Sequence, residues 1–296
     1  MGRIADALRR AEQERRMERS SSPAAGSAAT ILGEPPRLGR SPASDAVDPK
    51  PLVDEPISVV EGLDEALIPY YRSSSLVAEQ YRSLRTRLLS QNPHYEHRTL
   101  AITSSVPREG KSVTTLNLGS VLAEIRHLKV LVVDGDFRRG SLAAKLNQPS
   151  GPGLAEVLAG EATYSEVIRR TPIPNLSFVP AGNTRKHSPA ELLTSAAAKP
   201  LFQRMLNEFH YTIVDTPPAT TVSDVGVIGQ LCSGVILVVR LHRTDEGAAK
   251  RSVRLLQANS IPIVGCLLVG RDAPGGRYGF GYENRYYDYY GKGKDG

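Results

Sequence analysis

The sequence predicts an α/β fold in which helices flank a mostly parallel central sheet. Short aliphatic runs with the length of strands follow one another from Thr99 onward, and amphipathic stretches with helical spacing separate most of them. Runs that are apolar throughout are typical of strands covered on both faces, as in parallel sheets. Ligands of such folds bind at the carboxyl ends of the strands. The expected strands are 99–103, 130–133, 176–179, 211–214, 235–239 and 263–269.

Composition favours one globular domain with appendages. The chain has 296 residues, a formal net charge of +6 and a pI near 9.3, but its 37 Lys and Arg are spread along the sequence. A spread of this kind indicates a solvated surface, so no nucleic-acid partner is expected. No apolar run approaches the roughly 18 residues of a membrane helix, and no secretory signal is present. Cys232 and Cys266 lie in apolar runs and are expected to be small buried hydrophobes in a reducing cytoplasm.

Four segments are expected along the chain. Residues 1–19 resemble a short charged helix, and residues 20–70 form a flexible linker because Ser, Pro, Ala, Gly and Asp occur there without periodicity. Residues 71–276 form the globular domain, and residues 277–296 form a tyrosine-rich tail.

Helices are expected at four places in the globular domain. Apolar residues recur at helical spacing between Ser75 and Gln91, and again from Ser112 onward. A later helix follows Thr244, which is expected to be its N-cap. A further loop, 183–189, is expected to open a helix at Ala190.

Residues 101–112 indicate a phosphate-binding loop. A strand, a tight turn and a helix follow one another there, so backbone N–H groups converge where a polyphosphate would lie. In the G-x-x-x-x-G-K-[ST] pattern, Lys111 would reach the β- and γ-phosphates and the Ser112 hydroxyl would bind Mg²⁺. Ser105 stands where the pattern has its first Gly. The residues expected to contact the nucleotide are Val106, Pro107, Arg108, Glu109, Gly110, Lys111, Ser112 and Val113.

Two carboxylates follow the apolar run 130–133. If the backbone stays extended, Asp134 and Asp136 project to the same side, where one can hold the Mg²⁺ shell and the other can approach an attacking hydroxyl. A solvated Asp-Gly-Asp turn is the alternative. The position of this pair beside the phosphate loop favours the catalytic interpretation.

A third acid, Asp215, ends the run 212–214 and precedes two prolines. This arrangement is typical of a Walker B acid, although an acid that only caps a turn is the alternative. Asp224 is expected to be an N-cap or a surface acid rather than a metal ligand. The expected catalytic residues are therefore Lys111, Asp134, Asp136 and Asp215, and the expected metal ligands are Ser112, Asp134 and Asp215.

The tail holds half of the twelve tyrosines of the chain and no aliphatic residue. A segment of this composition cannot form a core, so its phenol hydroxyls should be exposed. Next to a phosphate-binding loop, they indicate phosphoryl transfer to the protein's own tail. An adhesive Gly/Tyr segment is the alternative. The expected acceptors are Tyr278, Tyr282, Tyr286, Tyr287, Tyr289 and Tyr290.

On these motifs, roughly from Leu76 to the C-terminus, the chain resembles bacterial tyrosine kinases of the capsular and exopolysaccharide biosynthesis type. The matching segments are 106–112, 131–139, 214–218 and the tyrosine cluster. The resemblance implies a P-loop NTPase fold of the MinD/ParA type. It also implies autophosphorylation in trans that uses ATP and Mg²⁺, modifies the tail and regulates polymer synthesis or export.

The resemblance further implies partners. In this family a helix before the core carries E-x-x-R-x-x-R and serves ring-like self-association, and Glu79, Arg82 and Arg85 fit that spacing. They share one helix face and could pair with acids of a neighbouring copy, although a solvated charged face is the alternative. A separate transmembrane polysaccharide co-polymerase would activate the chain at the inner face of the membrane, and a tyrosine phosphatase would reverse the modification.

A MinD- or ParA-like switch ATPase is the strongest rival interpretation. Such proteins have a second lysine at the position of Val106 and no need for clustered tyrosines. The strand 265–271 lacks the Asn often found there for the nucleotide base, so ATP as the nucleotide follows from the resemblance alone.

Overall fold

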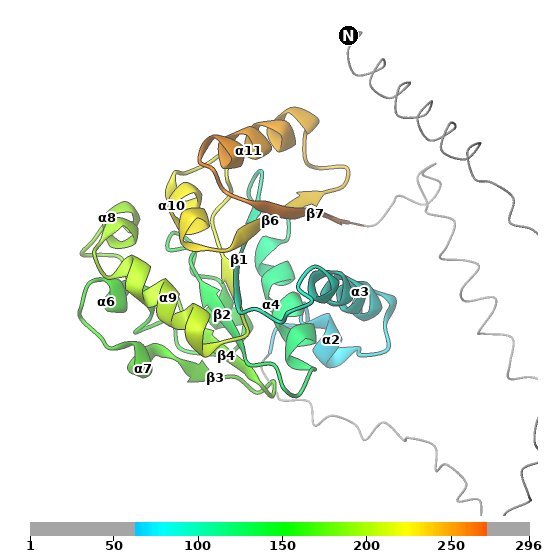
Figure 1. Cartoon of the computed structure of the whole chain (residues 1–296), viewed down its shortest axis with the longest axis horizontal. Helices are drawn as coiled ribbons and strands as arrows, with labels where there is room; N and C mark the ends of the chain where they lie inside the picture. The colour runs from blue at the N-terminus through cyan, green and yellow to red at the C-terminus, as the bar shows by residue number, and fades with distance from the viewer. Residues whose placement is uncertain (1–62, 271–296) are drawn as a thin grey trace, which may run out of the picture. The chain divides into compact units, whose positions relative to one another are not determined.

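The computed structural model describes residues 63–270 (Figure 1). The predicted helix 1–19, most of the predicted linker and the whole tyrosine-rich tail lie outside the described residues. The description below concerns the globular domain.

Within residues 63–270, seven strands form one sheet in the order β3-β4-β2-β5-β1-β6-β7. Every neighbouring pair is parallel except β3 and β4, which are antiparallel. All six predicted strands are confirmed, and only the two-residue edge strand β3 was not predicted. The strands are β1 (Arg98–Ser104), β2 (Val130–Asp134), β3 (Arg169–Arg170), β4 (Leu176–Val179), β5 (Tyr211–Asp215), β6 (Gly234–Arg240) and β7 (Ile263–Val269).

Helices cover both faces of the sheet. In Figure 1, α2, α3 and α4 gather on the side of the sheet opposite α8, α9 and α10. The helices are α2 (Ile68–Tyr71), α3 (Leu76–Ser90), α4 (Lys111–Ala123), α5 (Leu142–Lys145), α6 (Leu154–Leu158), α7 (Tyr164–Val167), α8 (Pro189–Thr194), α9 (Ala198–Glu208), α10 (Asp224–Leu231) and α11 (Glu246–Ala258).

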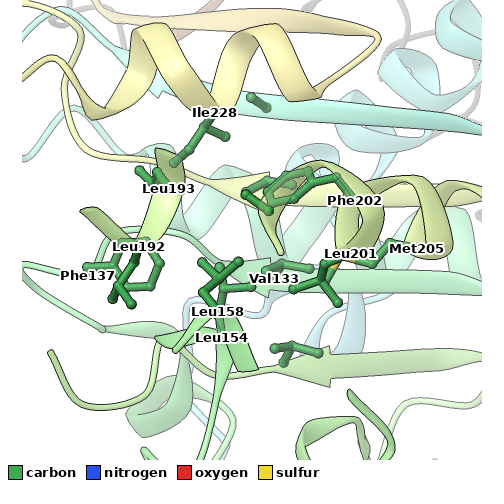
Figure 2. Packing of buried hydrophobic residues seen from close by; sticks show 14 of the residues in the cluster. Val133, Phe137, Leu154, Leu158, Leu192, Leu193, Leu201, Phe202, Met205 and Ile228 are labelled. Carbon is green, nitrogen blue, oxygen red and sulfur yellow. The ribbon is translucent and has the colours of Figure 1, made fainter. Parts of the chain in front are cut away.

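Strand β2 explains why the predicted strands are apolar throughout. Leu131 and Val133 belong to the hydrophobic cluster under α6, α8 and α9, whereas Val130 and Val132 belong to the cluster under α3 and α4. Because successive side chains of a strand point to opposite faces, a sheet covered on both faces needs apolar residues at every position. Figure 2 shows Val133 among the side chains of the first cluster.

Helix ends follow the expected capping chemistry with one correction. The Ser75 hydroxyl accepts the amide of Ala78 at the start of α3, and the Ser188 hydroxyl accepts the amide of Glu191 at the start of α8. The predicted N-cap Thr244 is wrong by one residue, because Asp245 caps α11 by accepting the amide of Ala248 at 3.0 Å. A carboxylate caps well, which leaves the Thr244 hydroxyl for another partner.

The folded region begins earlier than the expected boundary at residue 71. Leu63 and Leu67 are buried in the cluster under α4. The Asn117 side chain of α4 accepts the amide of Ile68 at 3.0 Å and donates to the carbonyl of Ala66 at 2.8 Å. These two isolated leucines have no periodic neighbours, which is why residues 63–70 look like linker in the sequence.

The two cysteines differ from the expectation of burial. Cys232 is partly buried, whereas Cys266 is exposed. Cys266 lies on β7, which is an edge strand of the sheet formed by residues 63–270 and pairs there with β6 alone. Edge strands retain apolar residues on a half-open surface, and the sequence of β7 alone does not show that it is an edge. In the described part of the chain, no helix is long and apolar enough to span a membrane.

Candidate active site

The sheet order brings the three predicted motifs together. Strands β2, β5 and β1 are neighbours, and their carboxyl ends carry the acid pair, the Walker B acid and the phosphate loop. The register pairs Asp134 with Asp215 across β2 and β5, and Asp215 with Ile102 across β5 and β1. Asp215 therefore lies between the phosphate loop and the acid pair.

The phosphate loop ends in a turn that leaves the start of α4 open. Gly110 has φ +96°, a left-handed conformation that suits glycine, and it is the N-cap of α4. No side chain caps this end of α4, and its first turn holds no acidic residue. The free amides and the positive end of the helix dipole suit a bound anion such as a phosphate group.

Lys111 lies between two carboxylates. Its Nζ atom is 2.8 Å from Oδ2 of Asp136 and 3.8 Å from Oδ1 of Asp215. The side chain is almost completely buried, as are both acids. Buried charges are stable only when they are paired. Here the ammonium group of Lys111 pairs with the carboxylates of Asp136 and Asp215.

Ser112 and Asp215 form the part of the site that suits a divalent cation. The Ser112 hydroxyl donates to Oδ2 of Asp215 at 2.6 Å, and Ser141 donates to Ser112 at 3.3 Å. Oδ1 of Asp215 is buried and accepts no hydrogen bond from the described residues, and the ammonium group of Lys111 remains 3.8 Å away from it. An unsatisfied buried carboxylate oxygen is costly, and a hard cation is a natural partner for it.

A Mg²⁺ ion bound here would have few protein ligands. Within residues 63–270, no three His, Cys, Asp or Glu side chains form a group that could hold a metal ion by themselves. Mg²⁺ is usually held by one or two carboxylates together with substrate phosphates. Ser112 and Asp215 fit that pattern.

Asp134 is turned toward the loop that follows β2. Its Oδ2 accepts the amide of Leu142 at 2.9 Å, and its Oδ1 accepts the amide of Asp136 at 3.2 Å. Burial raises the pKa of Asp134, and the negative charge of Asp215 adds to the increase. Burial likewise raises the pKa of Asp215, against the lowering effect of Lys111. Asp134 thus shapes the turn that carries Asp136, and its role as a metal ligand stays a prediction.

Asp224 is neither an N-cap nor a surface acid. Ser223 is the N-cap of α10, and Asp224 is its first residue with only 3% of its surface exposed. Arg138 explains the burial, because its Nε atom donates to Oδ2 of Asp224 at 3.3 Å. The pair ties α10 to the loop that carries Asp136.

Glu109 braces the phosphate loop with a buried side chain. Its carboxylate accepts the amide of Val106 at 2.9 Å and the hydroxyl of Thr244, while Nη1 of Arg240 donates to the carbonyl of Arg108 at 3.1 Å. Arg240 at the end of β6 and Thr244 in the segment before α11 therefore hold the phosphate loop in place. Sequence analysis missed this function of Arg240 and Thr244, and no motif marks either residue.

The remaining predicted site residues lie as follows. Pro107 and Arg108 are exposed on the loop, Val106 is half-buried there, and Val113 lies in the first turn of α4. Thr220, which was not predicted, donates to the carbonyl of Ser105 at 2.5 Å and fixes the start of the loop. The six tail tyrosines lie outside the described residues.

The predicted self-association residues share one face of α3. Arg82 contacts Glu79 and lies 2.9 Å from Glu124, and Arg85 lies 2.6 Å from the same carboxylate. Glu124 is the C-cap residue of α4 in the same chain. Both arginines thus have an acid within their own chain, and pairing with a second copy stays a prediction.

Comparisons with known proteins agree with this geometry. A family model described as an AAA domain matches residues 98–247. The tyrosine-protein kinase CpsD of Streptococcus agalactiae serotype III is 30% identical over 198 residues, which cover 67% of this chain and 84% of CpsD. The chain spans 93% of one curated relative but only 28% of two longer ones.

Solved structures show the same relationship. The kinase domain of the Escherichia coli tyrosine kinase ETK superposes with a TM-score of 0.67 at 28% identity, covering 72% of this chain and 84% of that domain. The septum site-determining protein MinD of Pyrococcus horikoshii, solved with Mg-ADP, shares the fold at 22% identity and a TM-score of 0.50. The match covers 60% of the present chain and 74% of the MinD chain.

The fold, the phosphate loop and the relatives agree on one assignment. The predicted P-loop NTPase fold of the MinD type, with a mostly parallel sheet between helices, is confirmed. Lys111, Asp136 and Asp215 lie close together, and their catalytic roles stay a prediction. The chain therefore belongs to the bacterial tyrosine-protein kinases of capsule and exopolysaccharide systems, enzymes built on the P-loop fold.

Proposed function

We propose that this kinase transfers the γ-phosphoryl group of ATP to tyrosines in the tail of a second copy of itself. The observation that carries the proposal is the position of Asp136, whose carboxylate lies 2.8 Å from the ammonium group of Lys111. A base is thereby placed beside the residue that would hold the phosphates. A switch ATPase, which activates only water, has no need for a tail of clustered tyrosines.

The proposed transfer requires one bond to form and one to break. The phenol oxygen forms a bond to the γ-phosphorus, and the bond from that phosphorus to the β–γ bridging oxygen breaks, so that ADP leaves. Asp136 accepts the phenol proton, which a tyrosine of ordinary pKa near 10 retains at neutral pH. Lys111 and the amides at the start of α4 stabilise the charge on the transferred group.

Ser112 and Asp215 would hold Mg²⁺, which when bound neutralises charge on the β- and γ-phosphate oxygens. The unsatisfied Oδ1 of Asp215 supports this assignment. Asp134 would contribute to the metal shell from the adjacent strand, as the sequence motif predicts, and it fixes the turn that carries Asp136.

Transfer between copies needs an assembly that brings a tail to a neighbour's site. We assign that function to the face of α3 that carries Glu79, Arg82 and Arg85, in a ring-like homo-oligomer. A separate transmembrane co-polymerase would recruit and activate the kinase at the inner face of the membrane. A tyrosine phosphatase would reset the tail, so that cycles of modification regulate synthesis or export of the polymer.

Labelled ATP tests the proposal directly. The purified chain is incubated with γ-labelled ATP and Mg²⁺, alone and with the cytoplasmic segment of the co-polymerase, and its phosphoamino acids are identified. Phosphotyrosine is expected in the wild type. It should be absent from Lys111→Ala and from a variant with phenylalanine at all six tail tyrosines.

Tyr95→Phe is the matched control, because Tyr95 is an exposed tyrosine outside the tail. This variant should keep the label. Label that persists without the tail tyrosines would place the acceptors elsewhere. ATP hydrolysis without phosphotyrosine, with and without the co-polymerase segment, would favour a MinD-like switch ATPase.

A further inference from the structure

A polar cavity lies beside the residue that follows the proposed catalytic acid. Its volume is about 710 Å³, and Phe137, the residue directly after Asp136, forms part of its wall. The rest of the wall comes from two loops, 150–152 and 182–185, and from Glu156 of α6. Consecutive Cα atoms are about 3.8 Å apart, so the cavity begins one residue from Asp136.

Hydrogen bonds fix the two loops against each other. Glu156 accepts the amide of Gly153 at 2.7 Å with one oxygen and the amide of Asn183 at 2.9 Å with the other. The amide of Gly182 donates to the carbonyl of Ser150 at 3.2 Å. Both oxygens of Glu156, the one acid among the described residues of the wall, therefore accept backbone N–H groups, and these bonds fix the shape of the cavity.

Arg185 supplies a positive charge that the described part of the chain does not compensate. It lines the cavity and is exposed, and its guanidinium makes no ion pair or hydrogen bond with residues 63–270. The adjacent Lys186 differs, because its Nζ atom lies 3.0 Å from Glu161. A guanidinium with free donors recognises carboxylates through charge-assisted hydrogen bonds.

The tail presents carboxylates directly beside its tyrosines. Glu283 follows Tyr282, and Asp288 lies between Tyr287 and Tyr289. Tyr282, Tyr287 and Tyr289 thus have an acidic neighbour one residue away, whereas the other three tail tyrosines have none. An acceptor tyrosine and its acidic neighbour are one residue apart, as are Asp136 and the cavity-wall residue Phe137.

We propose that the Arg185 cavity binds the acidic residue that flanks the acceptor tyrosine in the tail of a second copy, and so selects which tyrosines enter the site. This inference rests on the proposed function. It adds a substrate class, a tyrosine with an adjacent carboxylate, and a residue that sets the preference. Arg185 acts on substrate binding and takes no part in the transfer of the phosphoryl group.

Peptide kinetics with exchanged charges test the proposal. The enzyme is the full chain with its six tail tyrosines changed to Phe and with Glu283→Gln and Asp288→Asn, so that its own tail neither accepts phosphate nor competes. The substrates are two synthetic peptides of residues 277–296, one with the natural sequence and one with Glu283→Lys and Asp288→Lys.

Arg185→Glu in this enzyme should raise KM for the natural peptide about tenfold and leave kcat within about twofold, the size expected for one charge-assisted contact. For the lysine peptide the order should be reversed, with a lower KM on the Arg185→Glu enzyme than on the parent enzyme. Lys186→Glu is the matched control, because Lys186 pairs with Glu161 outside the cavity wall. This control should keep the KM of the parent enzyme.

Two outcomes would overturn the inference in different ways. Phosphorylation of both peptides with KM values that Arg185→Glu does not change would reject the cavity as the selecting site and leave the proposed function intact. ATP hydrolysis without label on either peptide, on any of the enzymes, would reject the proposed function and this inference with it. Equal thermal unfolding midpoints of the variants show that a KM change is not a folding defect.

Discussion

The ammonium group of Lys111 lies 2.8 Å from Oδ2 of Asp136, and the two residues are only 6% and 4% exposed. The residue that would hold the phosphates is thus already paired with the residue that would accept the phenol proton. If Lys111 binds the phosphates, Asp136 loses its partner and becomes available as a base. Nucleotide binding and activation of the base are therefore coupled through one ion pair.

This coupling predicts that Asp136→Asn separates binding from catalysis. Phosphotyrosine formation should fall by about 10²–10⁴-fold, the usual contribution of a general base. Affinity for Mg-ATP, measured by calorimetry, should be unchanged or tighter, because Lys111 no longer has to leave Asp136. Glu208→Gln, at an acid of α9 that pairs with Arg204 ahead of the start of β5, is the control and should change neither quantity. A large loss of ATP affinity in Asp136→Asn would contradict the coupling.

A second prediction concerns Mg²⁺. The Ser112 hydroxyl is 2.6 Å from Oδ2 of Asp215, so Ser112→Ala removes one proposed metal ligand and leaves the carboxylate. Affinity for ADP measured with Mg²⁺ and with EDTA should differ strongly in the wild type and much less in Ser112→Ala. Ser252→Ala is a matched control, because Ser252 is a buried serine of α11 that bonds only to its own helix. An undiminished Mg²⁺ effect in Ser112→Ala would show that other residues hold the metal.

A third prediction concerns self-association through α3. Arg82 and Arg85 share the carboxylate of Glu124, and their side chains are 23% and 17% exposed, enough for another copy to reach them. Glu124→Gln removes the acid that both arginines share and leaves only Glu79 beside Arg82, so acids of a second copy have less internal competition for the two arginines. Self-association should tighten by about fivefold, in line with the roughly 1 kcal/mol of an exposed ion pair.

Sedimentation at low salt measures this effect. Arg85→Gln should weaken self-association, because it removes a positively charged donor from the proposed interface of each copy. Smaller species from Glu124→Gln would instead show that Glu124 orients the arginines for the interface.

A fourth prediction concerns the dependence of stability on pH. His210 accepts the amide of Lys129 through Nδ1 at 3.0 Å, and its ring centroid lies 4.8 Å from that of His97. Burial lowers the pKa of His210 below its ordinary 6.5, and the nearby charges of His97, His127 and Lys129 lower it further. His210 is therefore protonated at a higher pH in the unfolded chain than in the folded chain. Folding stability is consequently lost as the pH falls below about 6.5.

Urea unfolding is measured from about pH 7.5 to about pH 5.5, on either side of the ordinary histidine pKa of about 6.5. It shows whether the free energy of unfolding decreases as the pH falls. The wild type should lose stability more steeply than His210→Asn, which keeps an acceptor near the position of Nδ1. His94→Asn, at an exposed position, should follow the wild type. Equal slopes for the wild type and His210→Asn would contradict the assignment.

Much of the fold could be predicted because the sheet is covered on both faces. Burial at every position, as in 130–133, leaves an apolar signature that polar loops interrupt clearly. Strand β3 escaped prediction because its two residues, Arg169 and Arg170, carry charges and no apolar pattern. It exists because β4 offers them an antiparallel partner.

The core of the site could be predicted because topology brings strand ends together. Lys111, Asp136 and Asp215 follow from a motif and from adjacent strands. The support for the phosphate loop could not be predicted, since Thr244 reaches Glu109 across 135 residues of sequence. The burial of Asp224 likewise depends on Arg138 from another loop. Contacts of this kind arise from tertiary structure and leave no local pattern.

Mixing two variants, neither of which can label itself, tests the central claim most directly. Lys111→Ala keeps the tail but lacks a working site, and the variant with phenylalanine at the six tail tyrosines keeps the site but lacks acceptors. With labelled ATP and Mg²⁺, neither should become labelled alone, whereas the mixture should place phosphotyrosine on the tail of the Lys111→Ala chain. A mixture that stays unlabelled under conditions in which the wild type labels itself would contradict transfer between copies.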